Sequence, residues 1–305
     1  MNREYFKLLE DCTLCPRQCH ADRTGGQTGC CGGTAVVKAA RASLHQWEEP
    51  CLSGTRGSGT VFFSGCALGC VYCQNGPISQ GRAGREISVE RLAEIFMEQQ
   101  GRGAHNLNLV TADHYLPQVA AALDLARRQG CRLPVVWNCS GYQSLDSLRR
   151  LEGLVDIWLA DFKYMSPRLA ERYSGAADYP QVAQAALPEM FRQQPVAVFD
   201  RAGLLQRGLI IRHLLLPGCL EDSKKVLAWL FDRFGNRAWY SLMSQYTPPA
   251  ALDRAAYPEL LAKVSAAAYQ ELVDFCVELG LESAWVQEGD AAQDSFIPAF
   301  EGQGL

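Results

Sequence analysis

The 305-residue sequence contains no uninterrupted apolar run of about 18 residues, the length that a helix needs to span a bilayer. It also lacks a block of basic residues, and its 29 Lys and Arg are outnumbered by 33 Asp and Glu, which gives a formal net charge of -4. We therefore expect neither a membrane nor a nucleic acid as the main partner. No internal repeat or low-complexity tract is found, and the length suits one large α/β domain with a small appendage.

The first residues, MNREYFKLLEDC, contain no apolar segment typical of a secretion signal. We therefore expect a soluble, cytoplasmic protein, whose thiols stay reduced. This expectation matters because the chain has 13 cysteines. Closely spaced cysteines in a reducing compartment indicate metal binding or redox chemistry more often than disulfides.

From Thr60 onward, short β-rich runs alternate with helical patterns, which is typical of a parallel sheet with crossover helices. Strands are predicted over 60–63, 107–111, 134–138, 155–161, 208–216, 239–243 and 284–287, and helices after an N-cap at Ser88, over 118–129 and over 257–279. Six or seven such units predict an α/β fold, a partial (β/α)6 TIM-type barrel over 56–305. Residues 1–55 are expected to form a cysteine-rich metal-binding extension.

Cys66, Cys70 and Cys73 follow the first of these strands in SGCALGCVYCQN, with the spacing C-x3-C-x2-C. A closed zinc site takes four protein ligands, and so does a fully ligated iron–sulfur cluster. Three thiols therefore indicate a cluster with one iron open to a ligand that is not protein. The alternatives are a zinc site completed by a distant cysteine and three buried thiols.

This loop, placed after the first strand of a βα barrel, resembles the radical S-adenosylmethionine superfamily. The resemblance implies that Cys66, Cys70 and Cys73 hold three irons of a [4Fe-4S] cluster and that S-adenosylmethionine chelates the fourth iron. An electron from the reduced cluster would cleave S-adenosylmethionine to methionine and a 5'-deoxyadenosyl radical, which abstracts a hydrogen atom. A low-potential donor such as flavodoxin or ferredoxin would supply that electron.

Three further strand ends, VVWNCSGY, IWLADFKYM and LIIRHLLLPG, resemble the glycyl-radical-enzyme activases, in their pyruvate formate-lyase activating enzyme-like branch. The resemblance implies a glycyl radical enzyme as partner and a catalytic role for Lys163. It also implies that the contacts of S-adenosylmethionine are Tyr72, Asn75, Asn138, Ser140, Asp161, Lys163, Arg212 and Gln245. Independently of any family, Arg212 offers a planar cation to a carboxylate, and Asp161 and Lys163 share one face of their strand. The alternative for Asp161 and Lys163 is an ion pair with a purely structural role.

One motif departs from the activases, which carry Gly-Gly-Glu after the second strand, whereas this chain reads NLVTADHY. Thr111, Asp113 and His114 can still offer oxygen or ring-nitrogen atoms to the cofactor there. The role of each of the three stays open. The acidic pair in HQWEEPC is expected to be solvated, with a cover over substrate or cluster as the alternative.

A second cysteine group comprises Cys12, Cys15, Cys19 and Cys30, with the spacing C-x2-C-x3-C-x10-C. Four thiols at such spacing predict a closed site for zinc or a second iron–sulfur cluster, and spacing does not decide between the two metals. Cys31 and Cys51 are alternative fourth ligands, and scattered free thiols are the alternative to any site.

Three functions follow from these patterns. The first is a radical enzyme that activates a glycyl radical enzyme, and the second is the same chemistry on a small molecule or peptide. The third is a non-catalytic iron–sulfur or zinc protein.

Overall fold

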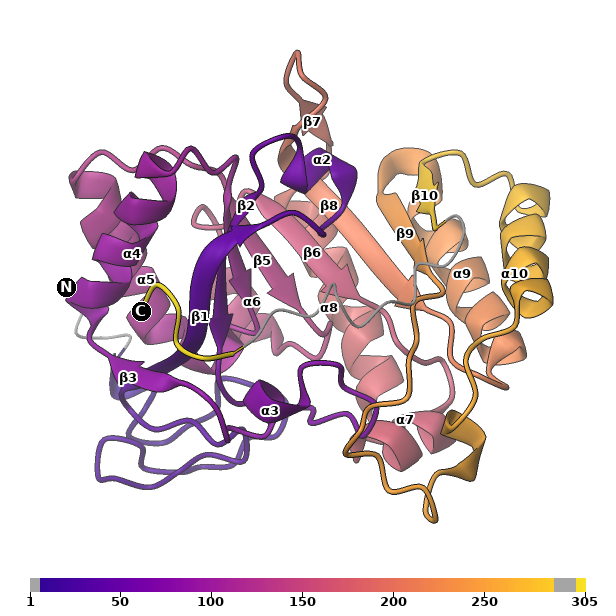
Figure 1. Cartoon of the computed structure of the whole chain (residues 1–305), viewed down its shortest axis with the longest axis horizontal. Helices are drawn as coiled ribbons and strands as arrows, with labels where there is room; N and C mark the ends of the chain where they lie inside the picture. Colours follow the sequence, from indigo (N-terminus) through magenta and orange to yellow (C-terminus); the bar gives the residue numbers. More distant parts are fainter. Residues whose placement is uncertain (1–5, 288–299) are drawn as a thin grey trace.

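A computed structural model describes residues 6–287 and 300–305 (Figure 1). Its main feature is a ten-stranded sheet with the order β10-β9-β8-β6-β5-β4-β2-β1-β3 and with β7 paired to β8 alone. The strands that run parallel are β2 (Ser58–Phe63), β4 (Leu107–Val110), β5 (Val135–Cys139), β6 (Ile157–Asp161), β8 (Leu205–Leu214), β9 (Trp239–Met243) and β10 (Ala284–Val286). The predicted α/β fold with a partial barrel is confirmed.

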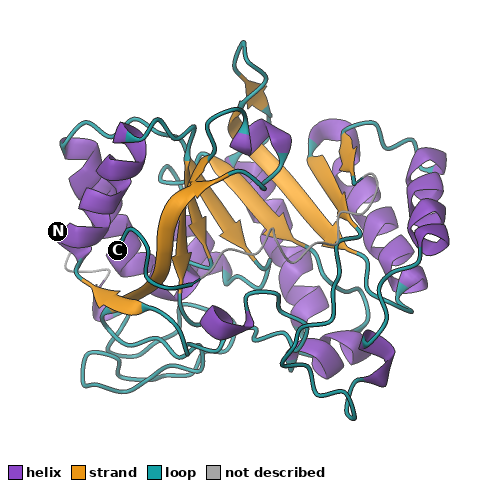
Figure 2. Ribbon diagram, viewed as in Figure 1, coloured by secondary structure: helices purple, strands orange, loops and turns teal. Residues whose placement is uncertain are grey.

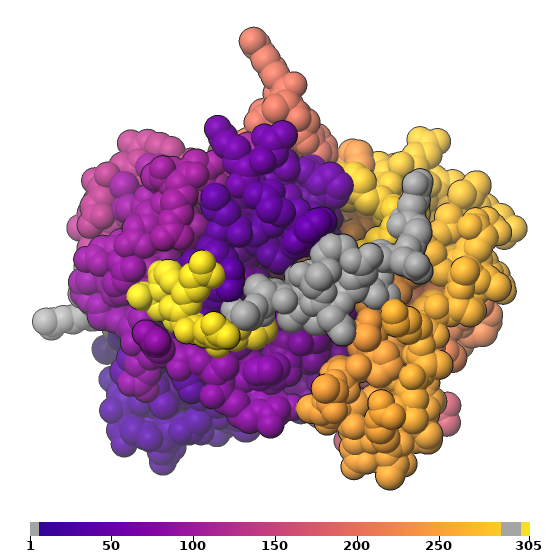
Figure 3. Space-filling view, viewed as in Figure 1, coloured from indigo at the N-terminus to yellow at the C-terminus, as the bar shows by residue number. Residues whose placement is uncertain are grey.

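Three antiparallel strands lie outside the predicted set: β1 (Val37–His45), β3 (Arg85–Ile87) and β7 (Val198–Phe199). The β1 sequence, VKAARASLH, is rich in Ala and cations and so has a weak strand signal. It lies within the stretch assigned to the N-terminal extension, so extension and barrel share one sheet. Residues 300–305 cover β1, where Gly302 N–H donates to Ala40 O at 3.0 Å, and Figure 3 shows this yellow segment on the indigo strand.

Helices flank the parallel strands (Figure 2). They are α2 (Pro50–Ser53), α3 (Gly76–Ser79), α4 (Val89–Gly101), α5 (Leu116–Arg128), α6 (Leu145–Arg150), α7 (Pro167–Ser174), α8 (Tyr179–Gln193), α9 (Leu220–Phe234) and α10 (Ala266–Glu278), with 3-10 turns at η1 (Asp113–Tyr115), η2 (Gly235–Arg237) and η3 (Pro258–Leu260). The predicted cap is present, because Ser88 accepts from Arg91 N at 3.1 Å. The single helix predicted over 257–279 is wrong, since Ser265 caps a separate helix α10 after η3.

The carboxyl ends of the parallel strands point to one edge of the sheet, where Figure 1 also shows the N-terminal loops, α3 and α7. Large side chains such as Trp137 and Trp158 fill the core between the sheet and its helices and are completely buried. Among the described residues, every helix is too short or too polar to cross a bilayer.

Candidate functional site

The three-cysteine loop joins β2 to α3 at this edge. Gly65 and Gly69 adopt positive φ values of 94° and 61°, which bend the backbone sharply around the thiols. Leu68 N–H donates to Cys66 Sγ at 3.4 Å, and the Ser174 hydroxyl donates to Cys70 Sγ at 3.0 Å. Burial, together with the neighbouring Cys70, raises the pKa of the Cys66 thiol to about 12. A metal must therefore displace the proton from this thiol at neutral pH.

The donor set of this loop fits an iron–sulfur cluster in its chemistry, because soft thiols grouped in one turn are the ligands that such clusters take. Within residues 6–287 and 300–305, no three Cys, His, Asp or Glu side chains already have the arrangement of a formed metal centre.

A cavity of about 200 Å³ opens beside Cys70 and Cys73. It is lined by Cys70, Tyr72, Cys73, Gln74, Asn75, Asp161, Lys163, Arg212, Leu214, Met243 and Gln245. Most of the side chains predicted as cofactor contacts thus meet in one place, although they come from the cysteine loop and from the ends of β6, β8 and β9.

A buried ion-pair network forms one wall of the cavity. Asp161 pairs with Lys163 Nζ at 2.5 Å and with Arg212 Nε at 2.9 Å, and all three side chains are less than a fifth exposed. Burial opposes ionisation of Asp161, but the charges of Arg212 and Lys163 outweigh it and lower the pKa of this carboxyl. Burial also opposes the charge of Lys163, yet Asp161 raises the pKa of the lysine to about 12. The network therefore stays charged across the neutral range.

Behind Arg212 lie Asn138 and Glu48. Arg212 Nη2 donates to Asn138 Oδ1 at 2.6 Å, and Nη1 lies 3.5 Å from Glu48 Oε2. Glu48 and Glu49 were expected to be solvated, and this expectation is wrong. The residue Glu49 is only 8% exposed, and the side chain of Glu48 is only 9% exposed. Burial raises the pKa of both carboxyls against the opposing charge of Arg212. The sequence feature that could have indicated this burial is the position of two adjacent acids between Trp47 and Pro50.

Thr111, Asp113 and His114 do not line the cavity, and His114 Nδ1 is buried without a hydrogen-bond partner among the described residues. Asp113 Oδ1 accepts from Trp137 Nε1 at 2.7 Å, and His114 Nε2 bonds to Ser64 O at 2.8 Å. Burial raises the pKa of Asp113 to about 6 and lowers that of His114 to about 4. Ser140 is also away from the cavity, and its carbonyl accepts from Tyr179 OH at 2.9 Å.

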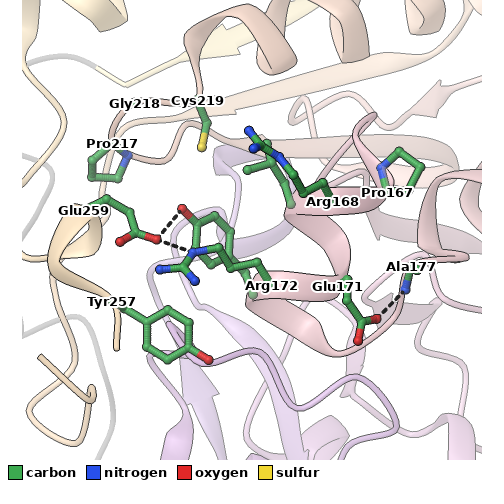
Figure 4. A pocket seen from close by; sticks show the side chains of 12 residues that line it. Pro167, Arg168, Glu171, Arg172, Ala177, Pro217, Gly218, Cys219, Tyr257 and Glu259 are labelled. Atoms are coloured by element: carbon green, nitrogen blue, oxygen red, sulfur yellow. Dashed lines mark hydrogen bonds and ion pairs between the residues drawn. The ribbon is translucent and has the colours of Figure 1, made fainter. Parts of the chain in front are cut away.

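A larger cavity of about 1000 Å³ lies on the same edge, between α7 and the turn that follows β8 (Figure 4). Arg172 and the Tyr173 hydroxyl both bond to Glu259 Oε1, at 2.5 and 3.1 Å, and Cys219 stands across from them. Tyr173 packs edge-to-face on Tyr72 with ring centroids 6.4 Å apart. Because Tyr72 lines the smaller cavity, the two tyrosines separate the two spaces. Pro217 and Gly218 of the motif LIIRHLLLPG line this larger cavity.

The N-terminal cysteines are free thiols, like all 13 in the chain. Cys12, Cys15 and Cys31 are buried, Cys19 is half-buried, and the predicted ligand Cys30 is exposed. Cys51 packs elsewhere, in an apolar cluster with Val136 and Ile157.

Comparison with known proteins adds a family match. Residues 60–187 match the model of the Radical SAM superfamily, a stretch that includes the three-cysteine loop, Asp161 and Lys163. This stretch is therefore similar to radical SAM domains, whose superfamily implies a [4Fe-4S] cluster and S-adenosylmethionine.

Among curated proteins, the uncharacterized protein MJ0674 of Methanocaldococcus jannaschii is 26% identical over 276 residues, which cover 87% of this chain and 73% of that protein. Three solved structures are similar to part of this chain at low identity. SuiB of Streptococcus suis bound to precursor peptide SuiA is 8% identical with a TM-score of 0.47, over 73% of this chain and 46% of SuiB. SuiB bound to S-adenosylmethionine is 9% identical with a TM-score of 0.49, over 73% of this chain and 48% of SuiB.

The third structure is the FeFe-hydrogenase maturase HydG of Carboxydothermus hydrogenoformans, 15% identical with a TM-score of 0.45 over 79% of this chain and 60% of HydG. The chain thus spans about half the length of the SuiB chains that it matches.

Proposed function

We propose that the protein, whose residues 60–187 match the model of the Radical SAM superfamily, reductively cleaves S-adenosylmethionine in the cavity beside Cys70 and Cys73. The observation that carries the proposal is the position of the charged network. Asp161, Lys163 and Arg212 line the same cavity as two of the loop cysteines. When bound, the cluster supplies the electron that breaks the carbon–sulfur bond and releases the 5'-deoxyadenosyl radical.

The protein's own residues have separate tasks in this proposal. Cys66, Cys70 and Cys73 would hold three irons of the cluster, and two of these residues, Cys70 and Cys73, line the cavity. Arg212 and Lys163 are two cations in the cavity lining and Asp161 is the one carboxyl there, so the lining offers more positive than negative groups. Such a wall suits the carboxylate of the methionyl group.

The other predicted contacts divide by position. Tyr72, Asn75 and Gln245 line the cavity and are proposed to bound the nucleoside and methionyl groups. Asn138 is proposed to orient Arg212, since it accepts from the guanidinium. Four predicted contacts do not line the cavity, and we propose that they support the residues that do. They are Ser140, Thr111, Asp113 and His114.

For the substrate, we propose a glycine of a glycyl radical enzyme, with flavodoxin or ferredoxin as the electron donor. The resemblance of VVWNCSGY, IWLADFKYM and LIIRHLLLPG to the activases supports this choice. The cavity of about 1000 Å³ beside the tyrosine pair is large enough for a loop of a partner protein. Because the same volume suits a free peptide or a small molecule, hydrogen abstraction from one of these is the second candidate.

The test uses full-length protein purified and reconstituted without oxygen, then given dithionite and S-adenosylmethionine. We expect 5'-deoxyadenosine release that is abolished by Cys70→Ala. Cys276→Ala is the matched control, because this thiol packs in the core beside Leu272 on α10 and away from the loop. No release from wild-type protein that holds four irons per chain would overturn the proposal and favour a binding or electron-transfer protein.

A second assay identifies the substrate. Glycyl radical enzymes carrying α-deuterated glycine are incubated with the reconstituted protein, and deuterium in 5'-deoxyadenosine is measured. Transfer supports the activase proposal. Transfer only from added peptides or small molecules supports the second candidate.

A further inference from the structure

Arg23 is a buried cation without an anionic partner. Its residue is 1% exposed, and its guanidinium donates to two backbone carbonyls, Thr34 O and His114 O. In the part of the chain that the structure describes, no carboxylate forms an ion pair with it. A buried charge is costly unless an opposite charge compensates it. The structure thus has a cationic position that lacks its counter-charge.

Thiols also lie near Arg23, whose guanidinium carbon is 5.6 Å from the centroid of the Tyr115 ring. Arg23 Nη1 lies 3.8 Å from Cys12 Sγ. A Cβ atom on Gly33 would lie 3.0 Å from Arg23 Nη2 and 3.2 Å from Cys31 Sγ. The glycine therefore lets the guanidinium and this sulfur approach the same point.

Two more of the N-terminal thiols meet at a second glycine. A Cβ atom on Gly29 would lie 3.4 Å from Cys31 Sγ and 3.5 Å from Cys19 Sγ, so these sulfurs flank one small space. Cys19 Sγ in turn donates to the carbonyl oxygen of Cys12 at 3.9 Å. Cys12, Cys19 and Cys31 therefore lie near one another, and Cys15 lies between Cys12 and Cys19 in the chain.

A backbone donor is directed at one of these sulfurs, as in the three-cysteine loop. Gly33 N–H donates to Cys31 Sγ at 3.4 Å, just as Leu68 N–H donates to Cys66 Sγ. Donors placed on sulfur are typical of ligated thiolates.

We propose that Cys12, Cys15, Cys19 and Cys31 bind one thiophilic metal centre and that Arg23 is its buried counter-cation. Either zinc or an iron–sulfur cluster suits four thiolates. Zn²⁺ with four thiolates carries a charge of about -2, as does an oxidised [4Fe-4S] cluster with four thiolates, and binding releases the four thiol protons. The centre therefore supplies the negative charge that Arg23 lacks. Cys30, which is exposed, is not a ligand, so the ligand set differs from the one predicted from spacing.

This inference does not rest on the proposed radical chemistry, and its test is made independent of it. Full-length protein carrying Cys66→Ala, Cys70→Ala and Cys73→Ala together removes the other thiol group, so any remaining zinc, iron or sulfide belongs to the N-terminal residues. In this background, Cys31→Ser is compared with Cys30→Ser, which changes the adjacent, exposed thiol. Metal and sulfide per chain are measured after anaerobic purification.

We expect Cys31→Ser to lose metal at least tenfold and Cys30→Ser to retain it. About one zinc per chain identifies a zinc site, and iron with an equal amount of sulfide identifies a cluster. Background protein that binds neither metal overturns the proposal, as does loss of metal in Cys30→Ser with retention in Cys31→Ser.

Two further measurements apply if Cys31→Ser is poorly folded. Cobalt(II) added to the background protein reports its thiolate ligands through sulfur-to-metal absorption, and a spectrum of fewer than four thiolates would overturn the ligand set. Arg23→Gln is expected to weaken metal affinity about tenfold, and Arg23→Lys less, because lysine keeps the cation. Equal affinities in a competition titration would contradict the role of Arg23.

Discussion

The backbone N–H of Cys66 donates to the carbonyl oxygen of Cys31 at 3.0 Å, so the two cysteine groups of the chain are joined directly. Cys31 belongs to the N-terminal group and Cys66 begins the loop after β2. Gly65 lies at this junction, and the ring of His114 beside it bonds back to Ser64 O. The position of the loop that is proposed to hold the cluster therefore depends on the N-terminal segment.

Gly65→Ala tests this dependence. A methyl group at Gly65 would overlap the Cys31 carbonyl oxygen, and the φ of 94° disfavours any side chain. We expect the free energy of unfolding to fall by about 2–3 kcal/mol, because both backbone strain and a steric conflict arise. Urea denaturation measures the loss, and iron per chain is expected to fall with it.

Gly69→Ala is the matched control for that variant. Gly69 lies in the same loop with a φ of 61°, but a Cβ added there would have no atom within 4 Å apart from its chain neighbours. Only backbone strain remains, so the loss is expected to be about 1 kcal/mol. Equal losses in the two variants would show that the contact with Cys31 does not hold the loop.

Asp161→Asn tests the charged wall. The substitution leaves Lys163 and Arg212 as two buried cations with their shared carboxylate removed. Removing one partner of a buried ion pair lowers the free energy of unfolding by about 3–5 kcal/mol, and urea denaturation at neutral pH detects this loss. Glu152→Gln is the control, since its pair with Arg192 is about half exposed and adds little to stability. A loss for Asp161→Asn no larger than for this control would show that the network is not a stabilising unit.

The sequence predicted the parallel strands and the three-cysteine loop because both signals are local. Runs such as LIIRHLLL and the short cysteine spacing can be recognised without knowing what packs against them. The convergence of Asp161, Lys163 and Arg212 also followed, since side chains at the carboxyl ends of neighbouring parallel strands meet at one edge.

What the sequence did not predict depends on contacts between distant segments. Glu48 looks like a solvated acid until β8 brings Arg212 against it. Cys30 and Cys31 are adjacent in the sequence, and only the folded loop buries one and exposes the other. The burial of Arg23 could not be predicted from its neighbours in the sequence, because its partners include the carbonyls of Thr34 and the distant His114 as well as the thiols.

The buried carboxyl of Asp113 gives a pH-dependent prediction. Its folded-state pKa is raised from 3.8 to about 6, so its contribution to stability is present below about pH 4 and is lost as the pH rises through about 6. Asp113→Asn removes this titration while the amide oxygen can still accept from Trp137. The stability of the variant relative to wild type should therefore rise by about 3 kcal/mol between pH 4 and pH 8.

Denaturation at a series of pH values measures that difference. His114 titrates in the opposite sense, since its lowered pKa of about 4 removes stability as the pH falls below its ordinary value of 6.5. It does so in both proteins, so its effect largely cancels in the comparison. A difference between variant and wild type that stays constant with pH would contradict the raised pKa of Asp113.

Ser174 gives a prediction about the cluster itself. Its hydroxyl donates to Cys70 Sγ at 3.0 Å and also bonds to Tyr164 OH at 2.9 Å, within a buried group that reaches Tyr72. Hydrogen bonds to ligand sulfur help to set the reduction potential of an iron–sulfur cluster, because they withdraw negative charge from it. Ser174→Ala is therefore expected to lower the potential of the cluster held by Cys66, Cys70 and Cys73.

A redox titration followed by electron paramagnetic resonance measures this potential in reconstituted protein. Ser147→Ala is the control, because Ser147 is also buried but its hydroxyl donates to Leu14 O at 2.6 Å, away from the loop. If both variants keep the wild-type potential, the Ser174 hydroxyl does not act on the ligated sulfur. A lower potential in Ser174→Ala alone would also slow cleavage of S-adenosylmethionine at a fixed low-potential donor, because a harder-to-reduce cluster holds the electron in a smaller fraction of molecules.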